Sequence, residues 1–250
     1  MAANDAASRI RAVILTTQRT GSTFLVDCLG SHPDIECASE ILIGEPDSLR
    51  PQYRGRFKQL AKVARIFTSG AWRPARRMEA YYAGGSARVR AFKVMYNQLA
   101  HPTALRYLRE NRDIRVLHLS RQNLLKVHVS RILMGKRARV QATGPVEAVQ
   151  TRVDPQEAIA AMRAARERYR HFESVFRDHP RLALTYESLF DGQRLRADTA
   201  ARICEFLGVS LQPMQSRLVK LNPETLRETV TNYEELAAAI ARTEFAELLD

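Results

Sequence analysis

The segment from residue 12 to residue 29 has the residue types of an anion-binding loop. A short apolar run, Ala12–Thr17, is followed by a turn that contains glycine and then by a helical pattern from Thr23. A helix that starts directly after a buried strand presents unpaired backbone N–H groups and the positive end of its dipole to one point, where phosphate is the usual occupant. The loop residues that can add charge or hydrogen bonds are Arg19, Thr20, Gly21, Ser22 and Thr23.

Two features limit the ligands that this loop can bind. It departs from the nucleoside-triphosphate loop GxxxxGK[ST], because it lacks the first glycine and the lysine after the second. The strand expected at Ile114–Ser120 is followed by Arg121, and it does not end in an aspartate that could hold magnesium. A kinase or ATPase is therefore disfavoured. An ordinary turn in which Ser22 caps the helix stays open as the alternative.

A second candidate phosphate site follows that strand. Arg121 stands at the strand exit, Asn123 can cap the next helix, and Ser130 lies two helical turns further along the same face. An arginine and a serine so placed can bind one phosphate between them. The alternative is an ordinary strand, cap and helix.

Short apolar runs alternate with helical patterns along the chain. This alternation predicts an α/β fold, a single P-loop-like domain over residues 1–250 with three layers, in which a mostly parallel central sheet is flanked by helices. Such a fold places its ligand at the carboxyl ends of the strands. The expected strands are Ala12–Thr17, Arg88–Met95, Ile114–Ser120 and Arg181–Tyr186, and the expected helices are Thr23–Leu29, Leu124–Met134, Pro155–Phe176, one ending at Gly208 and one from Tyr233.

The charge of the chain indicates an anionic partner. The net charge is +12, and residues 48–78 contain nine basic residues and no acidic one. Three unclustered cysteines and the absence of a CxxC or HxxxH spacing favour a reduced, cytoplasmic protein without a metal site. No apolar run is long enough to cross a bilayer. Composition does not decide whether the basic stretch contacts an acidic substrate, nucleic acid, lipid head groups or solvent.

Four segments of the chain together resemble the sulfotransferase family. TTQRTGSTFL resembles its 5′-phosphosulfate loop, and SRQNLLKVHVS resembles its 3′-phosphate motif. LTYESLFDG followed by ARICEFLGV is similar to the family's YExL…FLG stretch, and RLVKLNPETLRETVTNYEEL to the tail of bacterial members. The segments occur in family order over most of residues 11–236. The short spacing from the loop to Glu40 is most similar to that of bacterial carbohydrate sulfotransferases, among them the trehalose type.

The resemblance implies that the chain binds 3′-phosphoadenosine 5′-phosphosulfate (PAPS) and transfers its sulfuryl group to a hydroxyl of a carbohydrate or glycolipid. The loop residues Arg19, Thr20, Gly21, Ser22 and Thr23 would then bind the 5′-phosphosulfate. The other donor-binding residues that it implies are Arg121 and Ser130 for the 3′-phosphate and Tyr186 near the adenine.

The resemblance also implies catalytic roles for Arg19, Glu40 and Lys93. Animal cytosolic members place a histidine two residues after the lysine, where this chain has Met95. Glu40 matches the carboxylate of bacterial members, and a carboxylate beside an anionic donor suits proton abstraction from a hydroxyl. The alternatives are a surface glutamate for Glu40 and a surface lysine at the strand end for Lys93. His101 and His128 are weaker candidates for the base, because His101 precedes Pro102 in an expected turn and His128 lies within an expected helix.

Several expectations concern partners. Arg19, Lys93 and the loop amides are expected to neutralise the donor without a metal ion. The segment 46–86, basic and rich in aromatic residues, is expected to face the acceptor. The apolar segment Leu236–Leu249 can pack on its own core or form a homodimer, and peripheral membrane contact is compatible with the charge. The alternatives are a P-loop-like small-molecule kinase and a nonenzymatic, basic nucleotide- or nucleic-acid-binding protein.

Overall fold

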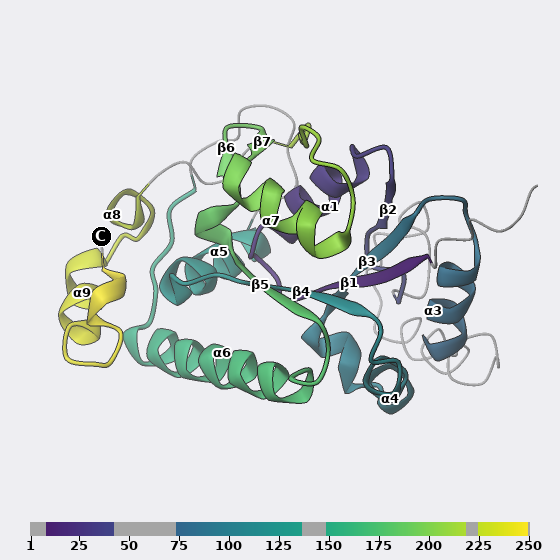
Figure 1. Cartoon of the computed structure of the whole chain (residues 1–250). Coiled ribbons are helices and arrows are strands. Elements are labelled where there is room, and N and C mark those ends of the chain that lie inside the picture. Colours follow the sequence, from purple (N-terminus) through teal and green to yellow (C-terminus); the bar gives the residue numbers. More distant parts are fainter. Residues whose placement is uncertain (1–8, 43–73, 137–148, 219–224, 250) are drawn as a thin grey trace, which may run out of the picture.

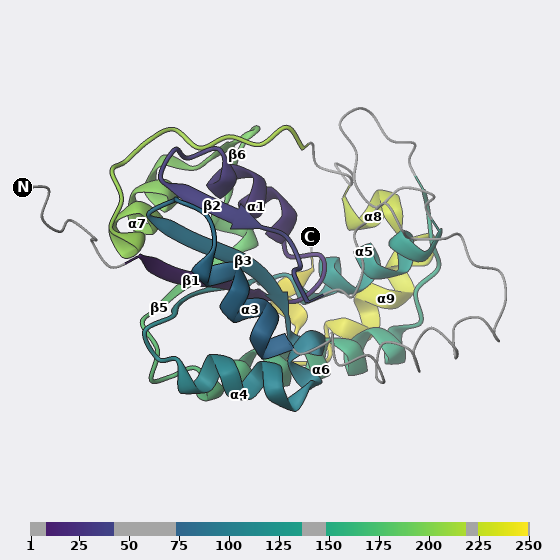
Figure 2. The same ribbon diagram turned by 90° about the vertical axis from the view of Figure 1, so that its right-hand side faces the viewer.

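Five parallel strands form the central sheet, in the order β2-β3-β1-β4-β5, and helices cover both of its faces (Figures 1 and 2). The computed structural model describes residues 9–42, 74–136, 149–218 and 225–249. The predicted fold class, a parallel sheet flanked by helices, is confirmed. The helices above and below the sheet exclude water from it, which explains why its strands read as continuous apolar runs.

The two strands that precede the predicted phosphate segments, β1 and β4, lie side by side inside the sheet. β1 (Ile10–Thr16) pairs with β3 (Val89–Met95) on one side and with β4 (Arg115–Ser120) on the other. All seven residues of β3 are buried. The edges are β2 (Ile35–Ala38) beside β3 and β5 (Arg181–Thr185) beside β4. All four pairings are parallel, so the carboxyl ends of the strands meet at one edge.

Each face of the sheet has its own apolar core. α1 (Ser22–Gly30) and α7 (Ala197–Leu207) cover one face, where Ile14 and Leu117 are fully buried. α7 ends at Gly208, which has the left-handed conformation (φ 66°) expected of a C-terminal cap. The helices of the second face are α3 (Pro74–Ala83), α4 (Pro102–Glu110) and α6 (Pro155–Val175).

A third apolar cluster joins α5 (Leu124–Lys136) and α6 to the last helices, α8 (Leu226–Thr229) and α9 (Tyr233–Ile240). Leu236, Ile240 and Phe245 are buried in this cluster, so the apolar segment Leu236–Leu249 packs on its own chain. Figure 1 shows α9 beside the amino-terminal half of α6. Across the described ranges no helix combines the length and apolar character that crossing a bilayer would require.

The structure contains elements that the sequence patterns did not indicate. β2 was missed because four residues, one of them the exposed Glu36, are too few to show a period. The interpretation of His101-Pro102 as a turn was wrong. Instead, the ring nitrogen Nδ1 of His101 accepts from the N–H of Thr103 and caps α4, and Pro102 begins that helix. A short hairpin, β6 (Phe190–Asp191) with β7 (Arg194–Leu195), was also not expected.

Part of the segment expected to face the acceptor belongs to the core. Residues 46–73 lie outside the described residues, whereas α3 packs on the sheet through the buried Met78 and Tyr82. The Tyr82 hydroxyl donates a hydrogen bond to the Ala12 carbonyl oxygen (2.8 Å). α3 thus serves as the crossover between β2 and β3.

Candidate functional site

Most of the predicted site residues lie near the carboxyl ends of the five parallel strands. The loop after β1 leads into α1, the turn after β3 forms a short 3₁₀ helix, η2 (Tyr96–Ala100), and the turn after β4 leads into α5. A second 3₁₀ helix, η3 (Tyr186–Ser188), follows β5. Ligands of open parallel sheets bind at this edge, in the crevice between loops that leave in opposite directions.

The loop after β1 holds its shape through its own side chains. Thr20 is fully buried, and its Oγ1 lies 2.9 Å from the Thr17 carbonyl oxygen and 2.6 Å from Thr16 Oγ1. Thr16 also donates to the carbonyl oxygen of Leu119 on β4 (2.9 Å). The Thr20 hydroxyl therefore ties the loop to the sheet, which leaves its backbone N–H as the group it can offer an anion.

The start of α1 is arranged as an anion site. Gly21 precedes the helix in the left-handed conformation (φ 77°), and no side chain of the described residues caps the first turn. Ser22 therefore begins the helix and does not cap it, contrary to the simple-turn alternative. The uncapped N–H groups of this turn and the helix dipole both favour a bound anion.

Gly21 lies against an aromatic wall. A Cβ atom at this position would stand 2.9 Å from Tyr186 Cδ2 and 3.1 Å from the Phe190 ring. Because left-handed backbone is also costly for other residues, we expect Gly21→Ala to lower the free energy of unfolding by about 1–3 kcal/mol, as measured by urea denaturation. Gly192→Ala is the matched control, since Gly192 has a similar φ (58°) and no atom within 4 Å of the added Cβ. Equal losses in the two variants would contradict a role for the aromatic wall.

The two predicted phosphate segments meet through their arginines. Arg19, itself in left-handed conformation (φ 66°), donates from Nε to Ser130 Oγ at 2.8 Å. Arg121 Nη1 donates to the carbonyl oxygen of Arg19 at 3.2 Å. The Arg121 guanidinium stacks on Tyr186, with 4.1 Å between its carbon and the ring centroid. Residues more than 100 positions apart in the chain thus form one cationic cluster.

The guanidinium of Arg121 is buried, and not all of its N–H groups have a hydrogen-bond acceptor among the described residues. Burial lowers its pKa, which the nearby Tyr186 and Glu187 partly offset. Its Nε is buried, and among the described residues it has no hydrogen-bond partner. A buried guanidinium N–H without an acceptor is costly, so an anion bound at this point would be strongly stabilised.

Glu187 is a supporting residue that sequence reasoning missed. Its carboxylate accepts from the backbone N–H groups of Gln122 (3.1 Å) and Asn123 (3.2 Å) directly after Arg121. Asn123 Oδ1 in turn accepts from the Lys126 N–H, which confirms Asn123 as the cap of α5. The available sequence signal was the acidic position that directly follows Tyr186 in YESL.

Glu40 and Lys93 form an ion pair beside α1. The Lys93 ammonium lies 3.1 Å from Glu40 Oε1 and 3.5 Å from Thr23 Oγ1. The Lys93 side chain is 3% exposed and that of Glu40 is 20% exposed, so neither is the surface residue of the alternative interpretation. Gln98, which sequence reasoning missed, donates from Nε2 to Glu40 Oε2 at 2.8 Å. Thr23 therefore connects this pair to the loop that also carries Arg19.

The two weaker histidine candidates lie in other surroundings. His101 caps α4, as described above. His128 lies on α5, where burial lowers its pKa and its Nε2 has no hydrogen-bond partner among the described residues. His101 thus serves as a helix cap and His128 lies within a helix, and both are structural positions.

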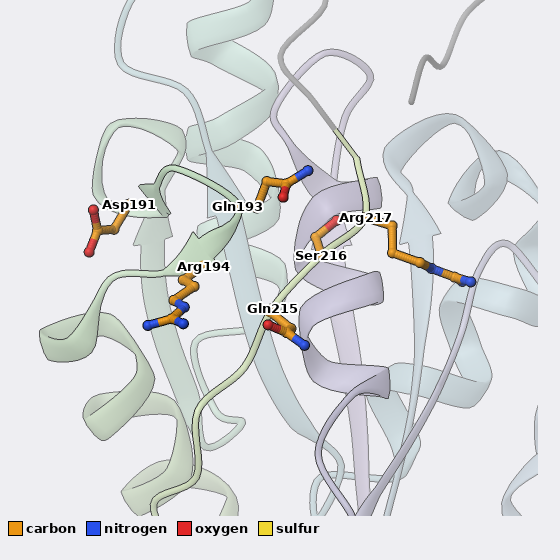
Figure 3. A pocket seen from close by; sticks show the side chains of 6 residues that line it. All are labelled: Asp191, Gln193, Arg194, Gln215, Ser216 and Arg217. Carbon is orange, nitrogen blue, oxygen red and sulfur yellow. The ribbon is translucent and has the colours of Figure 1, made fainter. Parts of the chain in front are cut away.

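A separate cavity of about 650 Å³ opens beside the β6–β7 hairpin (Figure 3). Its wall is joined to α1 by Ser216, whose hydroxyl donates to Asp27 Oδ2 at 2.8 Å. None of the predicted site residues lines it. The lining residues are Asp191, Gln193, Arg194, Gln215, Ser216 and Arg217.

Comparisons with known proteins agree with this architecture. The profile of the sulfotransferase family matches residues 12–213. Among solved structures, a sulfotransferase from Alicyclobacillus acidocaldarius is similar in fold, with a TM-score of 0.50, 17% identity and 97% of each chain covered. Among curated protein sequences, none matches significantly. The matched range contains both arginine segments, the Glu40–Lys93 pair and every strand of the sheet except the first two residues of β1, and on this ground the chain belongs to the sulfotransferase family.

Proposed function

We propose that the protein transfers a sulfuryl group from PAPS to a hydroxyl of a carbohydrate or glycolipid. The observation that carries this proposal is the continuous arrangement of donors at the strand ends. The cationic cluster of Arg19 and Arg121 adjoins the uncapped start of α1, and Thr23 in the first turn of α1 contacts Lys93, the partner of Glu40. One end of this arrangement suits phosphates, and the other suits proton transfer.

The donor-binding residues fit a nucleotide with phosphates at both ends of its ribose. Arg121, whose buried Nε has no partner among the described residues, and Ser130 would bind the 3′-phosphate. The N–H groups around Gly21, Ser22 and Thr23 would bind the 5′-phosphate. Tyr186, which already carries the Arg121 guanidinium on one face, lies at the same wall and would contact the base.

The chemistry divides between the chain's own residues. When bound, PAPS supplies a sulfuryl group whose bond to phosphate oxygen breaks as the acceptor oxygen bonds to sulfur. Glu40 accepts the proton of the acceptor hydroxyl. Arg19 and Lys93 stabilise the negative charge that develops on the transferring and leaving oxygens. Positioning of the reactants and this electrostatic stabilisation supply most of the rate enhancement. Arg19 keeps its charge at any working pH and therefore acts electrostatically, without donating a proton.

The first test is calorimetric titration with the spent donor, 3′-phosphoadenosine 5′-phosphate (PAP). We expect micromolar binding by the wild-type protein and a loss of at least 100-fold in Arg121→Ala, since the variant loses about two charge-assisted hydrogen bonds of roughly 1.5–3 kcal/mol each. ATP with magnesium serves as the control ligand. Arg112→Ala, an exposed arginine at the opposite end of β4, is the matched control variant. Absence of PAP binding by the wild type would overturn the proposed donor.

The proposed acceptor class rests on the composition of one segment, whereas the proposed donor rests on contacts in the structure. The basic and aromatic segment 46–73, outside the described residues, has the composition that stacks on sugars and pairs with anionic groups. A screen of PAP release from PAPS with trehalose, glucose, a glycolipid and 2-naphthol tests it. Turnover of 2-naphthol without any of the carbohydrates would contradict the carbohydrate proposal and leave sulfuryl transfer intact.

A further inference from the structure

Gln98 stands between the last residue of β3 and the carboxylate of Glu40. Its side-chain Oε1 accepts a hydrogen bond from the Met95 N–H (2.9 Å), and its Nε2 donates to Glu40 Oε2 (2.8 Å). A backbone N–H can only donate, so the amide oxygen must face Met95. The amide therefore cannot be reversed, and its NH₂ group must point at Glu40.

The two oxygens of Glu40 are held from two different elements. Oε1 faces the Lys93 ammonium on β3, and Oε2 faces the Gln98 amide on η2. Glu40 itself lies beyond the end of β2, where the backbone has no strand partner to orient it. Among the described residues, the Cys37 thiol on β2 also lies near Lys93, and burial raises its pKa to about 12, so it stays uncharged. Lys93 is thus the charged group that faces the carboxylate.

The position of Gln98 in η2 requires only a hydrogen-bond acceptor, but its side chain also acts as a donor. As the third residue of η2 it reaches back to the N–H of the preceding cap residue, a role that glutamate fills as well as glutamine. An ionised glutamate could accept from Met95 but could not donate to Glu40, whereas the amide does both. The second of these contacts has no explanation in the capping of η2.

We propose that Gln98 is a positioning residue for the general base. It fixes the rotation of the Glu40 carboxylate, so that an oxygen lone pair stays directed at the acceptor hydroxyl while Lys93 remains on the other oxygen. A glutamate side chain free to rotate would lose this alignment, and misplacement of a catalytic group by about 1 Å can cost on the order of 100-fold in rate. The inference rests on the proposed function, because it assigns a role within sulfuryl transfer.

Gln98→Glu separates capping from positioning. The variant keeps the cap of η2, so its affinity for PAP should match the wild type. It places a second carboxylate against Glu40, which favours the protonated form of the pair. We expect kcat to fall at least tenfold and the acid limb of the pH profile of kcat/KM to move to higher pH. The assay is PAP release from PAPS with trehalose, glucose and 2-naphthol, and with water alone.

The control for added charge is Asn97→Asp. Asn97 is the exposed neighbour of Gln98 on η2, so this variant brings the same charge close to the site without replacing the amide that contacts Glu40. Its acid limb should stay near that of the wild type. An equal shift in Asn97→Asp and Gln98→Glu would contradict the direct contact as the cause.

A double-mutant cycle tests whether Gln98 acts through Glu40. Gln98→Ala should lower kcat in the wild-type background and cause no further loss in Glu40→Gln, because the group that it positions is then gone. Losses of equal size in both backgrounds would overturn the inference, and so would a Gln98→Glu variant with wild-type kcat and pH profile. A wild type that neither binds PAP nor releases it from PAPS fails at an earlier step. That result contradicts the proposed function, and the inference falls with it.

Discussion

Glu40→Gln is expected to lower kcat for sulfuryl transfer by about 10²–10⁴-fold while PAP binds with wild-type affinity. The amide has almost the same shape as the carboxylate but cannot accept the acceptor's proton. Glu40 contacts Lys93 and Gln98, whereas the predicted phosphate ligands Arg121 and Ser130 lie in the cluster formed with Arg19. The expected result is therefore a loss in the chemical step with donor binding intact, measured by single-turnover PAP release and by calorimetry.

Two controls define the result. Glu40→Asp keeps the charge opposite Lys93 but withdraws the carboxylate by one methylene, so it should recover part of the lost kcat. Glu36→Gln changes another ion-paired glutamate, which lies on β2. Its Oε1 is 2.6 Å from Nη2 of Arg90. The kcat of Glu36→Gln should remain near wild type. A Glu40→Gln variant with wild-type kcat would remove Glu40 as the base and return attention to the residues of the segment outside the described ranges.

The second large effect concerns stability in acid. His118 lies on β4 beneath α6, and its Nε2 is 2.5 Å from the hydroxyl of Tyr96. Burial, aided by the nearby Arg181, lowers the pKa of His118 to about 4. Between about pH 6.5 and pH 4 the unfolded chain therefore binds a proton that the folded protein does not. The stabilisation is complete above the unfolded pKa and is lost as the pH falls toward the folded one.

This shift predicts that the free energy of unfolding falls by about 3 kcal/mol between pH 7 and pH 4 through His118 alone. Urea denaturation of the wild type and of His118→Gln across this range measures the effect, and the variant should show a shallower pH dependence. His171→Gln, at an exposed position on α6, is the control and should keep the wild-type slope. The low pKa of Glu244, about 2 because of its hydrogen bond with Arg163, begins to contribute near the lower end of this range and does so equally in the wild type and the variant. Identical slopes in wild type and His118→Gln would contradict the assignment.

Much of the fold could be predicted because the pattern of each long element is local. β1, β3, β4 and β5 are apolar runs bounded by polar residues, and α6 begins at the Asp154 cap followed by Pro155. These signals lie within a few residues of each boundary, so the strands and helices they predict agree with the structure to within about two residues. β2 and α4 were missed where the local signal was short or pointed to a turn.

The sequence by itself predicted an anion-binding loop, because a strand, a glycine turn and a helix in succession expose unpaired backbone N–H groups. It also determined that Arg121 would stand at the exit of β4. It did not determine which hydroxyls face the ligand. Thr20 has the right type and position, but its Oγ1 turns into the sheet because Thr16 and Thr17 offer it partners there.

Only the tertiary structure decided how the catalytic candidates meet. Glu40 and Lys93 are brought together because β2 pairs with β3 in parallel, with Ala38 opposite Phe92, so the chain leaving β2 passes the end of β3. That pairing depends on the crossover through α3, which no short-range pattern encodes. Gln98 joins them because β3 continues into a single turn of 3₁₀ helix that folds back over the strand end. Contacts between residues 53 or 58 positions apart follow from sheet order, and sheet order is settled by burial of the whole chain.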